Sequence, residues 1–140
     1  MGMKRGGHGS AASATFTGIT DLFKPKQRIG RLEDDVRIEG KSCLVTGSSS
    51  GLGKAAAIRL AKRGGRIIMA CRSGHPHAGE EVRKRSGNDA VEMEYIDLND
   101  LSSITGFCVR MKEKGVRFDI CVFNAGVVPG EDRRTRDGFS

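Results

Sequence analysis

The sequence predicts an α/β fold in which helices wind on both faces of a parallel sheet. From residue 41 onward, short apolar runs alternate with stretches of helix-forming residues. A loop rich in glycine and serine, TGSSSGLG at 46–53, directly follows the first apolar run. Strands joined through helices by right-handed crossovers lie parallel. We therefore expect a doubly wound sheet with the local strand order 3-2-1-4, truncated after the fourth strand.

The predicted elements follow from composition and hydrophobic period. Strands are expected at 42–46, 66–71, 91–96 and 118–123, and helices at 52–63, 77–87 and within 99–115. The run at 118–123 is almost continuously apolar, which is typical of a strand covered on both faces. Its far edge has no partner in the predicted sheet, and a buried strand left at an edge would favour aggregation.

For the third strand and the last helix, the sequence also predicts which side chains share a face and where the helix begins and ends. The run at 91–96 alternates, which places Val91, Met93 and Tyr95 on one face and the glutamates at 92 and 94 on the other, as in a strand near a sheet edge. The last helix is expected to be capped by Asp100 and to end at Gly115. Its buried stripe is expected to comprise Ile104, Phe107, Cys108 and Met111.

Residues 1–38 are rich in glycine, serine and charge and show no sustained period, so we expect a disordered leader or linker. Residues 39–140 are predicted to form one folded domain or part of one. The first twenty residues contain Lys4, Arg5 and no acid, which faintly resembles an organelle transit peptide. A plain leader on a cytoplasmic protein is the alternative. No run of apolar residues is long enough to predict a membrane span.

Composition argues against several classes of function. The formal charge of +7 could attract polyanions, but the basic residues are scattered and aromatic residues make up only 5% of the chain, which disfavours nucleic-acid binding. The four cysteines form no C-x-x-C pair, so we expect reduced thiols packed as small hydrophobic side chains. His75 and His77 have no clear third ligand nearby, and no metal site is predicted.

The loop at 46–53 has the composition of a phosphate-binding turn. A triphosphate-binding loop requires G-x-x-x-x-G-K-[ST], but Ser48 replaces its first glycine and Ala55 replaces the hydroxyl that binds magnesium. The dinucleotide pattern G-x-G-x-x-[GA] fits completely, with Ala56 at its last position. A pyrophosphate would there meet free N–H groups at a helix N-terminus. This pattern between a strand and a helix predicts a Rossmann-type fold.

The extended motif T-G-x-x-x-G-x-G at 46–53 resembles the cofactor loop of the short-chain dehydrogenase/reductase family. Three further matches follow in family order. The pair DL at 97–98 looks like the adenine-pocket pair, and NAG at 124–126 looks like the signature beside the cofactor ribose. The segment TRDGF at 135–139 resembles the start of the next helix in retinol-dehydrogenase-like members. The resemblance covers residues 41–140, about half of the family's usual domain. It implies that residues 39–140 form the N-terminal part of an NAD(P)-binding Rossmann domain.

The end of the second strand indicates which cofactor is preferred. Proteins that prefer NAD usually place an acid there for the ribose 2′-hydroxyl, whereas an arginine can pair with the 2′-phosphate of NADP. This chain has Arg72 at that position and no acid between Arg66 and Gly79. We therefore expect NADP(H) rather than NAD(H). The predicted cofactor-binding residues are Thr46, Gly47, Ser49, Ser50, Gly51, Leu52, Gly53, Arg72, Asp97, Leu98, Asn124, Ala125 and Gly126.

The resemblance implies interconversion of a carbonyl and an alcohol on a small molecule by hydride transfer. The resemblance to the retinol-dehydrogenase-like subgroup implies a lipophilic substrate such as a retinoid or steroid. The family's acid/base group is Tyr-x-x-x-Lys, but Tyr95 is the only tyrosine and Asn99 lies four residues after it. No catalytic residue is therefore assigned, and residues 1–140 alone are predicted to be inactive. Homo-oligomers would form through later helices. The alternatives are a non-catalytic dinucleotide-binding sensor and a basic interaction module.

Overall fold

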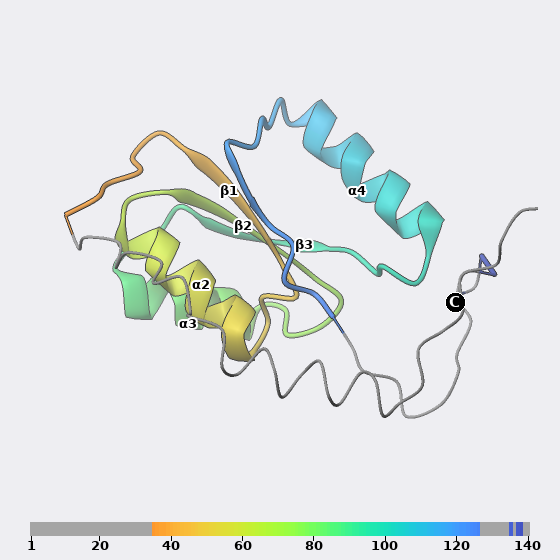
Figure 1. The fold of residues 1–140 in the computed structure, drawn as a ribbon, viewed down its shortest axis with the longest axis horizontal. Helices are drawn as coiled ribbons and strands as arrows, with labels where there is room; N and C mark the ends of the chain where they lie inside the picture. Colours follow the sequence, from red (N-terminus) through yellow and green to blue (C-terminus); the bar gives the residue numbers. More distant parts are fainter. Residues whose placement is uncertain (1–34, 127–134, 136, 139–140) are drawn as a thin grey trace, which may run out of the picture. The chain divides into compact units, whose positions relative to one another are not determined.

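The computed structural model describes residues 35–126, 135, 137 and 138. Its strands are β1 (Ser42–Thr46), β2 (Arg66–Cys71), β3 (Val91–Tyr95) and β4 (Ile120–Val122). Its helices are α2 (Gly51–Lys62), α3 (His77–Ser86) and α4 (Leu101–Glu113). Strands and helices thus alternate in the predicted order (Figure 1).

The four described strands form a parallel sheet with the order β3-β2-β1-β4, as predicted. Thr46 at the end of β1 pairs with Ala70 of β2, and Cys71 pairs with Tyr95 of β3. The carboxyl ends of these strands therefore lie together at one edge of the sheet. Parallel α/β sheets bind ligands at this edge, where the strand order reverses.

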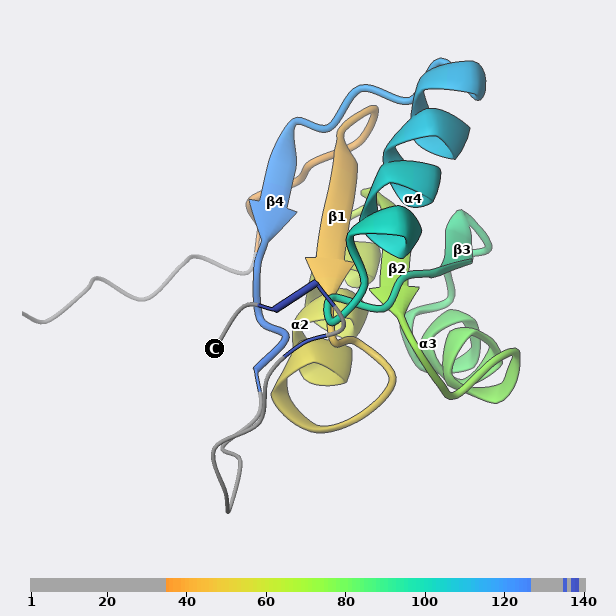
Figure 2. The same ribbon diagram turned by 90° about the vertical axis from the view of Figure 1, so that its right-hand side faces the viewer.

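Helices cover both faces of the sheet (Figures 1 and 2). Cys43 and Val45 of β1 belong to the buried cluster that includes residues of α2 and α3. Leu44, between them, belongs to a second cluster with Phe107 and Met111 of α4. Successive side chains of a strand point to opposite faces, so β1 and β2 each contribute to both clusters. This two-sided burial fits the continuous apolar runs of β1 and β2.

Helix α4 begins as its sequence predicts. The Asp100 carboxylate accepts hydrogen bonds from the backbone nitrogens of Ser102, at 2.9 Å, and Ser103, at 3.3 Å. Phe107 and Met111 are buried. Cys108 is exposed, so the prediction that it joins the buried stripe is wrong. An α-helix has 3.6 residues per turn, so neighbouring residues point in different directions. Phe107 points toward the sheet, and Cys108 therefore lies at the margin of the buried face.

The fourth strand is shorter and more exposed than its apolar sequence predicts. Only Ile120–Val122 pair as a strand, and Phe123 beyond them is 80% exposed. Cys121 is exposed as well, whereas Cys43 and Cys71 are buried, so the expectation of packed thiols holds for two of the four cysteines. In the described sheet β4 is an edge strand, whereas β1 lies between two strands. The residues of β4 are therefore less shielded by neighbouring strands than those of β1.

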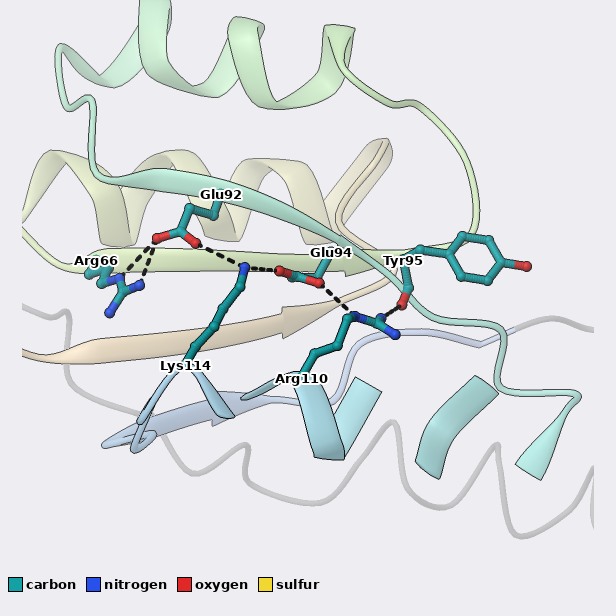
Figure 3. Close-up of polar contacts among 6 residues, drawn as sticks. All are labelled: Arg66, Glu92, Glu94, Tyr95, Arg110 and Lys114. Carbon is teal, nitrogen blue, oxygen red and sulfur yellow. Dashed lines mark hydrogen bonds and ion pairs between the residues drawn. The ribbon is translucent and has the colours of Figure 1, made fainter. Parts of the chain in front are cut away.

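The opposite edge strand, β3, has the two faces that its alternation predicts, with Val91 and Met93 in one cluster, but polarity does not indicate which of its side chains are buried. Tyr95 is 50% exposed, whereas Glu94 is only 8% exposed. Glu94 lies under α4, where Arg110 Nε is 3.2 Å from its Oε2 and Lys114 also forms an ion pair with it (Figure 3). The Arg110 guanidinium donates to the Tyr95 carbonyl oxygen at 2.7 Å as well. The face that carries the two glutamates is therefore an interface between β3 and the end of α4.

Ionisation of Glu94 reflects two opposing effects. Burial penalises its charged form and would raise its pKa, but the hydrogen bonds from Lys114 and Arg110 outweigh this and hold the pKa below its usual value. The same hydrogen bond raises the pKa of Lys114. Glu92, two residues earlier, pairs with Arg66 of β2 at 2.7 Å and lies 3.7 Å from Lys114 (Figure 3). These charges form a connected network that attaches α4 to the sheet.

Residues just before β1 also contact the domain. The Ile38 backbone nitrogen donates to the Arg63 carbonyl oxygen at 2.9 Å, and the Ile38 side chain packs against the cluster under α2 and α3. Arg63 in turn donates to the Val36 carbonyl oxygen at 2.7 Å. The leader predicted for residues 1–38 otherwise lies outside the described residues. No helix in the described part of the chain is long and apolar enough to cross a membrane.

Candidate dinucleotide-binding cleft

The glycine loop joins β1 to α2 and needs glycine for two different reasons. Gly47 has a φ of +62°, which side-chain-bearing residues rarely adopt. Gly53 leaves no room for a side chain, because an added Cβ would lie 2.5 Å from both Asn124 Nδ2 and the Gly47 carbonyl oxygen. The loop can therefore fold tightly against the segment that follows β4. Both requirements support the interpretation of this segment as a dinucleotide-type turn.

The N-terminus of α2 provides a setting that favours an anion. The helix begins at Gly51, and its first turn contains no acidic residue. Ser50 is the N-cap residue, and its side chain makes no capping hydrogen bond. The first N–H groups of a helix have no partner within the helix and carry the positive end of its dipole. A phosphate at this position would satisfy those donors.

Lys54 contributes to packing between helices. Its ammonium group lies 2.6 Å from Glu81 Oε2 of α3, so it is engaged one turn into α2, as a first-turn helix residue. Hydrogen bonds from Lys54 and Arg85 lower the pKa of Glu81. This ion pair gives Lys54 a role that needs no phosphate ligand.

Thr46 connects the glycine loop to the NAG segment. Its Oγ1 accepts hydrogen bonds from the backbone nitrogens of Asn124 and Ala125, each at 3.1 Å. The Asn124 side-chain amide donates back to the carbonyl oxygens of Thr46, at 3.2 Å, and Gly47, at 3.3 Å. Thr46 is 5% exposed, so these bonds are shielded from water. The predicted ribose segment and the predicted phosphate loop are thus one hydrogen-bonded unit.

At the other end of the cleft, Arg72 lies beside Asp97. The Arg72 Nη1 is 3.9 Å from Asp97 Oδ2, and the Arg72 side chain is 63% exposed. The Asn99 backbone nitrogen donates to Asp97 Oδ1 at 3.0 Å, and the Asp97 backbone nitrogen donates to Ser103 Oγ at 2.8 Å. Asp97 is therefore held from two sides by the segment that begins α4, while Arg72 extends into solvent.

These segments enclose a cleft of about 650 Å³ at the carboxyl ends of the strands. Eleven predicted residues line it: Gly47, Ser49, Ser50, Gly51, Leu52, Arg72, Asp97, Leu98, Asn124, Ala125 and Gly126. The two other predicted residues do not line the cleft but hold residues that do. The Thr46 hydroxyl group accepts a hydrogen bond from Asn124, and the absence of a side chain at Gly53 lets Gly47 and Asn124 approach. The sequence pattern therefore identified residues that the fold brings together, although they span 80 positions of the chain.

Sequence reasoning missed other lining residues, namely Ala70, Cys71, Ser73, Ile96 and Asn99. Each lies next to a residue of a recognised motif or a strand end, and this adjacency is the signal that could have identified them. Ser48 was also missed. It is fully buried, and its hydroxyl group donates to the Val45 carbonyl oxygen at 3.0 Å, which stabilises the loop from inside.

The histidines near the cleft are engaged in local contacts. His75 Nε2 lies 3.2 Å from the Cys71 carbonyl oxygen, and His77 Nδ1 lies 3.6 Å from Glu80 Oε2. His75 lies on the exposed turn before α3, and His77 is the exposed first residue of that helix. Among the residues that the structure describes, no three His, Cys, Asp or Glu side chains are grouped so that they could hold a metal ion.

The TRDGF segment is described only at residues 135, 137 and 138. The Asp137 carboxylate accepts a hydrogen bond from the Leu101 backbone nitrogen at 2.8 Å. It therefore satisfies an N–H at the start of α4, next to the Asp100 cap. The helix predicted to begin at this segment lies outside the described residues.

The residues present fit a dinucleotide. Backbone approaches closely where Gly53 has no Cβ, and hydroxyl and amide groups border a helix N-terminus without acids. The guanidinium group of Arg72 also lines the cleft. Main-chain donors for pyrophosphate and a planar cation for a further phosphate match the chemistry of such a ligand.

Known proteins are similar in sequence to this chain. The model of the short chain dehydrogenase family matches residues 41–138. Human retinol dehydrogenase 13 is 37% identical over 131 residues, covering 92% of this chain and 40% of that protein. Human retinol dehydrogenase 14 is 34% identical, covering 81% of this chain and 38% of that protein. The chain thus spans about two fifths of the length of these relatives.

Solved structures agree on the fold. A structure from Escherichia coli CFT073, described as a short chain dehydrogenase complexed with NADPH, matches with a TM-score of 0.60. The match covers 69% of this chain and 41% of that chain at 23% identity. Members of the matched family are oxidoreductases that bind a nicotinamide dinucleotide. The cleft geometry, the family model and the retinol dehydrogenase relatives together show that this chain belongs to the short-chain dehydrogenase/reductase family.

Proposed function

We propose that this chain forms the cofactor-binding part of an NADP(H)-dependent oxidoreductase. The observation that carries the proposal is the cleft itself, whose lining includes eleven of the thirteen residues predicted to bind the cofactor. An added Cβ at Gly53 would lie 2.5 Å from the Gly47 carbonyl oxygen, so the loop keeps its tight course only with glycine at this position.

Each part of the cleft has a distinct role in this proposal. The N–H groups at the start of α2, with Ser49 and Ser50, bind the pyrophosphate. Asp97 and Leu98 lie beside the adenine, and Asn124 to Gly126 lie beside the ribose next to the nicotinamide. Thr46 holds that last segment at a fixed distance from the loop through its two accepted hydrogen bonds. The cleft thereby orients the cofactor before a substrate arrives.

Arg72 supports a preference for NADP(H). It lines the cleft, and its side chain is 63% exposed, so its guanidinium group can turn toward a ligand without losing buried contacts. A planar guanidinium can donate two parallel hydrogen bonds to a phosphate. No carboxylate precedes it on β2 to accept a hydrogen bond from a ribose 2′-hydroxyl. The 2′-phosphate of NADP(H) thus has a cationic partner at the end of β2.

The parent activity in this proposal is hydride transfer between the nicotinamide and a carbonyl or alcohol. The cofactor supplies the hydride chemistry when it is bound. The relatives are named as retinol dehydrogenases, and this supports a lipophilic alcohol or carbonyl compound as the substrate class. The single tyrosine, Tyr95, lies on β3 and is not followed by the lysine of the family's acid/base motif. Residues 1–140 therefore bind and orient a cofactor in this proposal, and do not move the substrate's proton.

The preference can be tested by equilibrium titration of the purified chain with NADPH and with NADH. We expect NADPH to bind more tightly, and Arg72→Gln to weaken NADPH by roughly tenfold or more while changing NADH little. Arg59→Gln is the matched control, because Arg59 is an exposed arginine on α2 outside the cleft. Equal losses for both nucleotides in Arg72→Gln would contradict the assignment.

A further inference from the structure

A carboxylate stands within ion-pair range of the cation that we assign to the extra phosphate of NADP(H). Asp97 Oδ2 is 3.9 Å from Arg72 Nη1, and both residues line the cleft. The two side chains come from the ends of adjacent strands, because β2 ends at Cys71 and β3 at Tyr95. The pair therefore bridges the adenosine end of the cleft.

The two members of this pair differ in how firmly they are held. Asp97 is 23% exposed, and its Oδ1 accepts the Asn99 N–H at 3.0 Å. Its own N–H is bound to Ser103 Oγ at 2.8 Å, and Ser103 belongs to α4. Arg72 is 63% exposed. Asp97 is thus a fixed negative charge, and Arg72 is the movable partner.

We infer that Asp97 limits the preference for NADP(H) by competing with the 2′-phosphate for Arg72. This inference rests on the proposed role of Arg72 in cofactor binding. In the free chain, the guanidinium is attracted to the fixed carboxylate. A phosphate that binds Arg72 must replace part of that attraction, and it also approaches a like charge. NADH carries no phosphate at this position and meets neither effect.

The expected size of the effect is modest. Exposed ion pairs contribute little, so removing the carboxylate should raise NADPH affinity relative to NADH by roughly two- to fivefold. Any contact of Asp97 with the adenine would change both nucleotides alike and would cancel in the ratio of their dissociation constants. That ratio is therefore the quantity to measure, rather than either affinity alone.

The test is a double-mutant cycle on the chain with NADPH and NADH as ligands. The variants are Asp97→Asn, Arg72→Gln and the double variant, with Asp89→Asn as the control. Asp89 is an exposed aspartate just before β3, at the opposite end of the strand from the cleft, and its replacement changes the net charge equally. Asparagine retains an acceptor for the Asn99 N–H and preserves the local turn.

We expect Asp97→Asn to raise the NADPH-to-NADH preference, and we expect this gain to be smaller when Arg72 is already glutamine. No change of the ratio in Asp97→Asn, alongside a collapse of the ratio in Arg72→Gln, would overturn the inference and leave the proposed function intact. No change of the ratio in Arg72→Gln would overturn the proposed cofactor preference itself. A fall of the ratio in Asp97→Asn would show that the carboxylate positions Arg72 for the phosphate, and would also overturn the inference.

Discussion

The hydroxyl oxygen of Thr46 lies 3.1 Å from the backbone nitrogen of Asn124 and joins two segments that are 78 residues apart in the sequence. The same oxygen accepts the N–H of Ala125. One side chain at the end of β1 thus fixes the position of the segment that leaves β4. The distance between the two sides of the cleft depends on this contact.

Thr46→Val should loosen that connection. Valine has nearly the same shape but no acceptor, so two N–H groups would lose their partner, and we expect a loss of about 1–2 kcal/mol in the free energy of unfolding. NADPH affinity should fall as well, because the NAG segment would no longer be held. Urea denaturation and nucleotide titration measure the two effects. Thr46→Ser retains the hydroxyl group and should restore most of both; a serine variant as damaged as the valine variant would contradict the role given to the oxygen.

Gly53→Ala should be among the most damaging single-methyl changes in the chain. The added Cβ would lie 2.5 Å from the Gly47 carbonyl oxygen, which is backbone and cannot turn aside. We expect nucleotide binding to be lost and unfolding to require at least about 1–3 kcal/mol less, as for overpacked sites. Gly106→Ala in α4 is the matched control.

At Gly106 an added Cβ would meet only the end of the Arg110 side chain at 3.5 Å, which is an ordinary contact. Alanine also favours a helix by up to about 1 kcal/mol over glycine. We therefore expect Gly106→Ala to bind NADPH normally and to be as stable as the natural chain or more so. Circular dichroism melting and titration distinguish the two variants. Normal NADPH binding by Gly53→Ala would refute the close approach at the loop.

Glu94→Gln should destabilise the chain in a manner that depends on pH. The ionised carboxylate accepts hydrogen bonds from Arg110 and Lys114, and a neutral amide would weaken both, so we expect a loss of about 1–3 kcal/mol at neutral pH. The folded-state pKa of Glu94 lies below its ordinary value of 4.5. Its contribution is therefore complete above about pH 4.5 and is lost as the pH falls through the folded pKa.

The stability gap between the natural chain and Glu94→Gln should accordingly close on acidification below pH 4.5. Urea unfolding at several values between pH 7 and pH 3 measures this gap. Glu113→Gln provides the control, because Glu113 is an exposed acid of the same helix outside the network. A gap that remained constant over this range would mean that the ion pairs are not its source.

The chain alone should catalyse no carbonyl reduction. Its one tyrosine is 50% exposed on β3, and Asn99 stands where the acid/base motif would need lysine. General acid catalysis typically contributes a factor of about 10²–10⁴, so its loss leaves turnover near background. The measurement is NADPH consumption with lipophilic aldehydes and ketones, with a full-length member of the family as the positive control. Turnover by residues 1–140 that disappears in Gly53→Ala would contradict this prediction.

Local patterns predicted most of the fold. Asp100 was expected to cap α4, and its carboxylate does accept the N–H groups of Ser102 and Ser103. Capping requires only residues adjacent in sequence, so one short segment contains all the information. The strand order followed in the same way from the alternation of elements and the handedness of their connections.

What could not be predicted depends on residues distant in sequence. Glu94 is buried because Arg110 and Lys114 lie 16 and 20 positions later on a helix that crosses this face. Alternation alone assigns such a glutamate to solvent. In the cleft, too, local features were predictable and long-range contacts were not. The glycine spacing indicated the phosphate loop. The proximity of Arg72 and Asp97 arises only because two neighbouring strands end at one edge of the sheet.

The most direct test of the central claim is an NMR titration of the isotopically labelled chain with NADPH. We predict saturable shifts of backbone amide signals at the α2 N-terminus, Arg72, Asp97 and Ala125, with little change at the amino ends of the strands. Gly53→Ala, if folded, should lose these shifts together. Shifts absent at saturating NADPH, or confined to scattered surface lysines and arginines outside the cleft, would contradict the assignment of this cleft as a dinucleotide site.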